Sequence, residues 1–122
     1  MPHPFVVHRS DDGDLSVLSL EGYLDAHTAP RFERAIQDEI DAGRILLIVD
    51  GAQLKYISSA GLGVFMSFIE EIRDKGGDIK ICSLVPKVRQ IFDILGFQAI
   101  YDMVESRPAA VQRFAEVPTR EV

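Results

Sequence analysis

Apolar residues fall into short segments whose spacing indicates β-strands in several places. Residues 15–20 alternate as L-S-V-L-S-L, which is typical of a strand with one covered face. Residues 44–50 read R-I-L-L-I-V-D, and such a continuous apolar run is typical of a central strand covered on both faces. Further strands are predicted over 5–9, 78–84 and 100–104, and residues 54–57 form a short apolar bridge after the central strand.

Other segments space their apolar residues as a helix does. Between 61 and 73, apolar side chains recur every three or four residues and predict a helix with one apolar face: Leu62, Phe65, Ile69 and Ile72. Thr28 is placed as the N-cap of an earlier helix that ends near Ala42.

Two more helices are predicted in the last third of the chain. Pro86 begins a short helix that Gly96 ends. Its apolar face is predicted to contain Val88, Ile91, Phe92 and Leu95. Residues 107–114 form the last predicted helix, before a tail that we expect to be frayed.

The order of these segments predicts an α/β fold. The D-D-G-D turn at 11–14 joins the first two strands into an antiparallel hairpin, while the later strands alternate with helices. Such alternation is typical of parallel strands joined by helical crossovers. We therefore expect a mixed, mostly parallel sheet in a single domain spanning 1–122, with an ordered core over about 5–115.

Composition narrows the possible partners and compartment. The net charge of −6 argues against duplex DNA or an anionic membrane as the main partner, because both select for basic surfaces. The single cysteine, Cys82, excludes a disulfide within the chain and is interpreted as a small buried side chain. No apolar run approaches the length of a membrane span, so we expect a cytoplasmic protein.

Several enzyme motifs are missing. The string I-S-S-A-G departs from the G-x-S-x-G elbow of serine hydrolases, and all three histidines precede the serines. The same region lacks the G-K-[ST] end of a P-loop. Cysteine and histidine ligands at metal-binding spacing are absent, so the sequence predicts neither a metal nor a cofactor, and no enzyme activity.

The segment Y-I-S-S-A-G-L-G at 56–63 places two serines where a strand ends and a helix begins. A serine there can cap the helix. It can also hold a phosphate over the positive end of the helix dipole. The residues alone leave both interpretations open.

With three other segments, this octapeptide resembles the STAS-domain proteins of the anti-sigma factor antagonist (anti-anti-sigma) type. The other segments are L-E-G-Y-L-D-A-H-T-A at 20–29, I-V-D at 48–50 and V-P-K-V-R-Q-I-F-D-I-L-G-F at 85–97. The resemblance covers about residues 6–114. It implies a four- or five-stranded sheet flanked by about four helices.

The resemblance also implies a partner-switching role in bacterial regulation of transcription. The unphosphorylated antagonist binds an anti-sigma factor that is also a serine kinase, phosphorylation of one serine separates them, and a PP2C-type phosphatase resets the switch. A STAS scaffold that is not phosphorylated, or that binds a small ligand, is the alternative. The kinase, the pathway and the oligomeric state are not defined by the sequence.

The family motif D-S-[ST]-G-L-G places the phosphoacceptor directly after an aspartate. Aligned on G-L-G, Ser59 is the predicted acceptor, and Ser58, which replaces the aspartate, is the alternative. The predicted partner-binding residues lie in the loop after the second strand and along the following helix: Asp25, Thr28, Ser58, Ala60, Gly61, Gly63, Met66 and Ser67.

Overall fold

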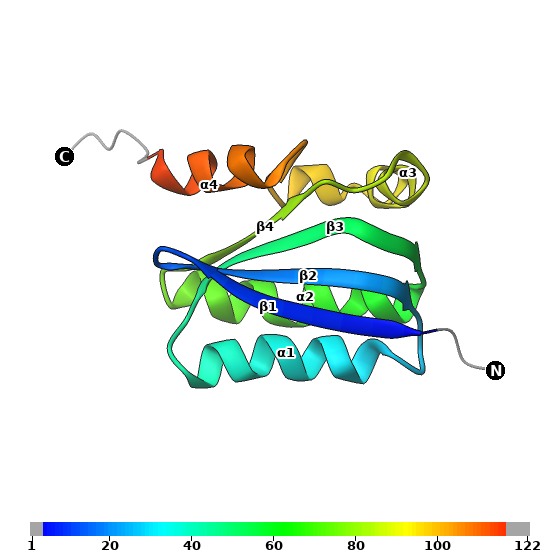
Figure 1. Cartoon of the computed structure of the whole chain (residues 1–122), viewed down its shortest axis with the longest axis horizontal. Helices are drawn as coiled ribbons and strands as arrows, with labels where there is room; N and C mark the ends of the chain where they lie inside the picture. Colours follow the sequence, from blue (N-terminus) through cyan, green and yellow to red (C-terminus); the bar gives the residue numbers. More distant parts are fainter. Residues whose placement is uncertain (1–3, 117–122) are drawn as a thin grey trace.

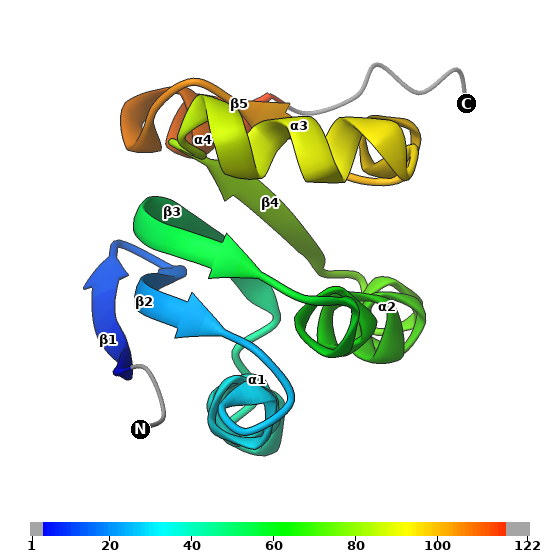
Figure 2. The ribbon, with the colours of Figure 1, turned by 90° about the vertical axis from the view of Figure 1, so that its right-hand side faces the viewer.

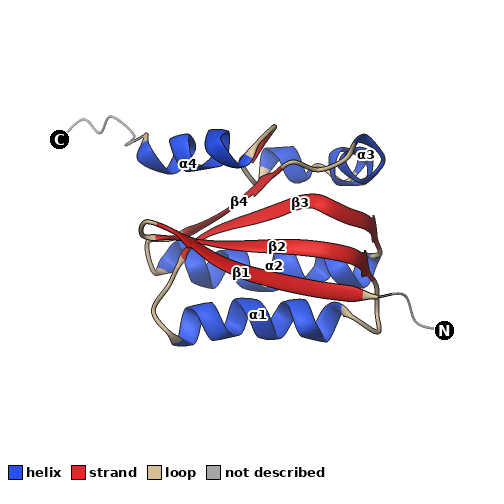
Figure 3. Ribbon diagram, in the orientation of Figure 1, coloured by secondary structure: helices blue, strands red, loops and turns tan. Residues whose placement is uncertain are grey.

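The computed structural model describes residues 4–116, which contain a five-stranded sheet of order β1-β2-β3-β4-β5. The strands are β1 (Phe5–Asp12), β2 (Leu15–Leu24), β3 (Leu46–Ile57), β4 (Asp78–Cys82) and β5 (Met103–Val104). The β1–β2 hairpin is antiparallel and every other pair is parallel (Figure 3). The expected mixed, mostly parallel sheet is therefore confirmed.

Helices cover both faces of this sheet. They are α1 (Ala29–Asp41), α2 (Ser59–Asp74), α3 (Pro86–Ile94), the short 3-10 helix η1 (Phe97–Ala99) and α4 (Arg107–Ala115). Helices α1 and α2 lie on one face and α4 lies on the other (Figure 1). Helix α3 crosses the edge at which the parallel strands end, as Figure 2 shows when that edge faces the viewer.

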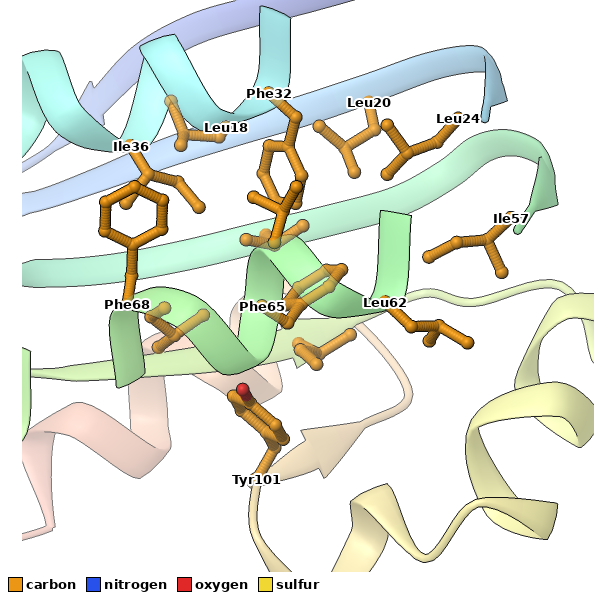
Figure 4. Close-up of a cluster of buried hydrophobic side chains, with 14 of the residues drawn as sticks. Leu18, Leu20, Leu24, Phe32, Ile36, Ile57, Leu62, Phe65, Phe68 and Tyr101 are labelled. Carbon is orange, nitrogen blue, oxygen red and sulfur yellow. The ribbon is translucent and has the colours of Figure 1, made fainter. Parts of the chain in front are cut away.

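Phe65 of α2 lies at the centre of the main core. Measured between ring centroids, its ring is 5.0 Å from that of Phe32 on α1 and 6.0 Å from that of Tyr101 (Figure 4). The ring of Phe92 on α3 is 5.6 Å away. All three contacts are edge-to-face, the arrangement that aromatic quadrupoles favour. One aromatic cluster thus fixes α2 against its neighbouring helices.

A smaller core lies beneath α4 on the opposite face. It contains Val17, Ile48, Cys82 and Ala110, all of which are fully buried or nearly so. Cys82 is a free thiol, and the desolvation that accompanies its burial raises its pKa to about 11. The interpretation of Cys82 as a buried apolar side chain is therefore confirmed.

The strands differ in length from those predicted. β2 continues to Leu24 because Glu21 pairs on both sides, with Val6 and Gln53. The predicted bridge at 54–57 belongs to β3, whose pairing with β2 shifts register along the way.

Two segments of the second half are shorter than predicted. β4 ends at Cys82, since Ser83 takes a left-handed φ of 65° that turns the chain. Ile100 precedes β5 instead of lying in it.

Candidate functional site

The carboxyl ends of β2 and β3 bring two segments of the chain together. Leu24 and Ile57 are paired at the last position of these strands, and the Ser58 N–H donates a 2.9 Å hydrogen bond to the Leu24 carbonyl. The loop 25–28 and the start of α2 are therefore neighbours. These two segments contain the predicted partner-binding residues Asp25 and Thr28 and the two serines, Ser58 and Ser59.

The two serines have different environments. Ser58 is the N-cap of α2, with an extended backbone, and its hydroxyl is buried without a hydrogen-bond partner among the described residues. Ser59 is the first helical residue and is exposed. The helix thus begins two residues earlier than predicted, and Ser58, rather than Ser59, holds the cap position.

The amino end of α2 has no side-chain cap. The Leu62 N–H bonds to the Ser58 carbonyl at 3.0 Å, but no side chain caps the helix. The N–H groups of the first turn point away from the helix and carry the positive end of its dipole. A negative charge on the exposed Ser59 side chain would lie beside these donors.

Gly61 is buried for a packing reason. A Cβ atom added there would lie 2.7 Å from Leu24 Cγ and 2.9 Å from Ile57 Cγ1. The core side chains of Leu24 and Ile57 thus occupy the space in which a larger residue at 61 would place its side chain. Gly63 is different, since it is exposed and a Cβ there would have no neighbour within 4 Å.

Met66 and Ser67, two of the predicted partner-binding residues, continue the exposed face of α2. Met66 is 46% exposed, and its sulfur accepts a hydrogen bond from the Tyr101 hydroxyl at 3.9 Å. The Ser67 hydroxyl donates to the Gly63 carbonyl at 2.8 Å. Ala60 is half-buried and packs against the main core.

Hydrogen bonds of Asp25 and Thr28 with backbone groups of residues 23–28 hold the loop after β2 in place. The Asp25 carboxylate accepts hydrogen bonds from the N–H groups of His27 at 2.9 Å and Thr28 at 3.2 Å. Desolvation opposes ionisation of Asp25, but these hydrogen bonds outweigh it and hold its pKa below the usual range. The backbone of its own loop therefore holds this carboxylate in its charged form.

Thr28 occupies the predicted N-cap position of α1, but its hydroxyl does not cap that helix. Instead the hydroxyl donates to the Tyr23 carbonyl at 2.8 Å and accepts from the Asp25 N–H at 2.9 Å. Thr28 is buried, so it shapes the loop from within.

Three exposed apolar side chains near this edge were not identified from the sequence. Tyr56 is 44% exposed, and the centroid of its ring lies 6.1 Å from that of Tyr23. Leu95 was assigned to the apolar face of α3, yet it and its neighbour Ile94 are exposed. In the sequence, only Ile94 indicated an exposed apolar side chain on α3, because it lies outside the predicted apolar face of that helix.

Neither a metal site nor a membrane-spanning helix is found in the described part of the chain. Within residues 4–116, no cluster of three or more histidine, cysteine, aspartate or glutamate side chains could hold a metal ion. Over the same residues, no helix has the length and apolar character to span a membrane.

Comparisons with known proteins find a matching family model and several relatives. A family model described as STAS domain matches residues 6–110. BtrV of Bordetella bronchiseptica, named as a candidate anti-sigma factor antagonist, is 35% identical over 103 residues, which cover 84% of this chain and 88% of BtrV. The anti-sigma-B factor antagonist of Bacillus subtilis is 27% identical over 104 residues, with 85% and 94% covered.

Solved structures share the same fold. An anti-sigma factor antagonist from Mycobacterium paratuberculosis superposes with a TM-score of 0.85 at 20% identity, over 93% of this chain and 96% of that one. The antagonist SpoIIAA in its unphosphorylated form gives 0.78 at 21% identity, over 93% and 100%.

Proposed function

The chain belongs to the STAS-domain family, and from that premise we propose that it is an anti-sigma factor antagonist switched by phosphorylation of Ser59. In this proposal the unphosphorylated form binds an anti-sigma factor that is also a serine kinase. A phosphate on Ser59 releases that partner, and a PP2C-type phosphatase removes the phosphate. The proposed site of action is the bacterial cytoplasm, with neither nucleic acid nor membrane as a partner.

The observation that carries the proposal is the difference between the two serines. A kinase must reach the hydroxyl that it phosphorylates, and Ser59 is exposed at the start of α2. The Ser58 hydroxyl is buried, so its phosphorylation would require the first turn of the helix to open. This contrast supports Ser59 as the acceptor and Ser58 as a residue that shapes the helix start.

The surroundings of Ser59 also support a switch that leaves the fold intact. A phosphate carries about −1.5 to −2 charges, which the open N–H groups of α2 can stabilise. A partner docked over the same spot would have to desolvate this dianion. The fixed Asp25 carboxylate lies on the adjoining loop and belongs to the surface that the partner contacts in this proposal.

The proposal is tested by incubating the purified chain with ATP and the purified anti-sigma factor/serine kinase of its own organism. Intact mass and peptide mapping should find one phosphate, on Ser59. Ser59→Ala should abolish it, and Ser58→Ala should still be phosphorylated. A phosphate on Ser58 would move the switch to the cap residue, and no phosphate at all would favour the unphosphorylated scaffold.

A further inference from the structure

The outer edge of β1 is a free edge of the sheet. β1 comes first in the strand order, so among residues 4–116 it pairs with β2 alone. The strand is eight residues long, its register with β2 contains no bulge, and every residue from His8 onward is exposed. Figure 2 shows that α1 lies on the β2 side of β1 and leaves this edge uncovered. An edge of this kind can accept a further strand.

The hydrogen-bond pattern shows which backbone groups point out from the edge. The Tyr23 N–H donates to the Pro4 carbonyl at 3.0 Å, so the even-numbered residues of β1 exchange hydrogen bonds with β2. The N–H and C=O groups of Val7, Arg9 and Asp11 therefore face away from β2. Within residues 4–116, these outward groups have no hydrogen-bond partner.

One end of the outer edge is already occupied. Arg31 of α1 donates a 3.0 Å hydrogen bond to the Phe5 carbonyl, in agreement with the outward direction of the odd-numbered residues. A strand added beside Phe5 would have to displace this arginine. The free part of the edge is therefore residues 7–12, next to the hairpin turn.

We infer that this free part pairs with the same part of a second copy of the chain, in antiparallel orientation and with a two-fold axis at Ser10. In this register Arg9 lies opposite Asp11 of the other copy, and His8 lies opposite Asp12 of the other copy. The two-fold axis repeats both pairs. Opposite charges that face each other across two strands stabilise the pairing.

Arg9 is held ready for this contact within each copy. Its Nε donates to the buried Glu39 carboxylate at 2.7 Å, and its Nη2 lies 2.8 Å from Asp11 Oδ1. Arg9 and Asp11 are alternate residues of a strand, so both side chains are on the same face of the sheet. Pairing thus joins two Arg9–Asp11 ion pairs into one cluster of four alternating charges.

Other registers of the same edge lack this match. An axis at Arg9 would set two arginines opposite each other, and an axis at Asp11 would set two aspartates opposite each other, which is destabilising. An axis at His8 would place no acidic residue opposite a basic one. An axis at Val7 would require the Phe5 carbonyl, which is occupied. The charges of β1 therefore favour the axis at Ser10.

This inference does not depend on the proposed function. The paired residues lie at the hairpin end of β2, whereas Ser59 follows the opposite end, where Leu24 of β2 pairs with Ile57 of β3. A dimer formed through β1 therefore leaves Ser59 accessible in both copies. It presents the candidate functional site twice.

The first test is sedimentation equilibrium of the full chain alone, from about 10 μM to about 1 mM. The contact is short, so we expect a weak dimer with a Kd of about 100 μM. Asp11→Lys should weaken it at least about tenfold, because four basic groups then meet at the axis. Asp14→Lys is the matched control, since it makes the same change of charge in the turn, outside the paired residues. Circular dichroism checks that both variants are folded.

The second test is disulfide formation at the axis. In the proposed register the two Ser10 residues form a non-hydrogen-bonded pair with Cα atoms about 4.5 Å apart, which a disulfide can span. Mild oxidation of Ser10→Cys should therefore give a covalent dimer on a non-reducing gel. His8→Cys should not, because its two copies do not face each other in this register. Cys82 is buried and does not compete.

The outcomes decide the inference whatever the result for Ser59. A chain that stays monomeric up to about 1 mM would overturn it. A dimer that crosslinks through His8→Cys instead of Ser10→Cys, or that Asp11→Lys and Asp14→Lys weaken equally, would also overturn it. If Asp11→Lys does not fold, the two cysteine variants decide alone. A monomer whose outward β1 amides exchange more slowly only after the purified anti-sigma factor/serine kinase is added would assign the edge to that partner and overturn the dimer.

Discussion

At the scale of single residues, the two glycines of the A-G-L-G segment lack a side chain for different reasons. Gly61 faces Leu24 and Ile57 at distances that exclude a Cβ, whereas Gly63 faces open space. Packing therefore requires glycine at the first position. At Gly63 the fold does not require glycine. A partner docked on a flat surface there would require it.

This difference gives a matched pair of substitutions. Gly61→Ala should lower the free energy of unfolding by about 1–3 kcal/mol through overpacking. Gly63→Ala should raise it by about 0.5–1 kcal/mol, because alanine is the better helix former and meets no neighbour. Urea denaturation followed by circular dichroism measures both. Equal effects of the two variants would contradict the packing explanation for Gly61.

At the scale of secondary-structure elements, Glu39 joins α1 to β1 and to the segment that leads into β3. The Glu39 carboxylate is buried and accepts hydrogen bonds from Arg9 at 2.7 Å and from Arg44 at 2.8 Å. Desolvation alone would raise the pKa of Glu39, but the hydrogen bonds from Arg44 and Arg9 outweigh it and lower the pKa to about 2.

The lowered pKa predicts an acid-sensitive contribution to stability. The carboxyl group is more acidic folded than unfolded, where its pKa is about 4.3. Its contribution is therefore complete above that value and is lost as the pH falls toward 2. It should amount to about 3 kcal/mol at pH 7. Urea denaturation of Glu39→Gln and the unsubstituted chain should show a difference that shrinks between pH 5 and 2.

Asp11 provides the control for this prediction. It also pairs with Arg9, at 2.8 Å, but its side chain is 62% exposed. Asp11→Asn should therefore cost less than about 1 kcal/mol at pH 7. A stability difference for Glu39→Gln that stays constant between pH 5 and 2 would show that Glu39 contributes by shape and not by charge.

At the scale of the whole molecule, the sequence predicts the architecture better than it predicts the surface. Spacing of apolar residues depends on local geometry, so the hairpin, the parallel strands and the four helices were predictable. The path of β3 through 51–53 was not, because it depends on pairing with β2. Leu95 fits the apolar stripe of α3, yet no element within residues 4–116 covers it, and it is exposed.

The same limit applies to the candidate site. The sequence located the two serines at a strand–helix junction, and the family motif favoured Ser59. Which hydroxyl faces solvent depends on where the first turn of α2 begins, and a shift of two residues decides it. The burial of the Ser58 hydroxyl could not be predicted from residue types alone.

The central claim is that a phosphate on Ser59 releases the partner while the fold persists. The most direct test is the dissociation constant of the purified anti-sigma factor/serine kinase for the unphosphorylated chain and for the chain phosphorylated at Ser59, measured by calorimetry. We expect at least about a hundredfold weaker binding of the phosphorylated form, equivalent to about 2.7 kcal/mol, with unchanged circular dichroism. Equal affinity of the two forms would contradict the account.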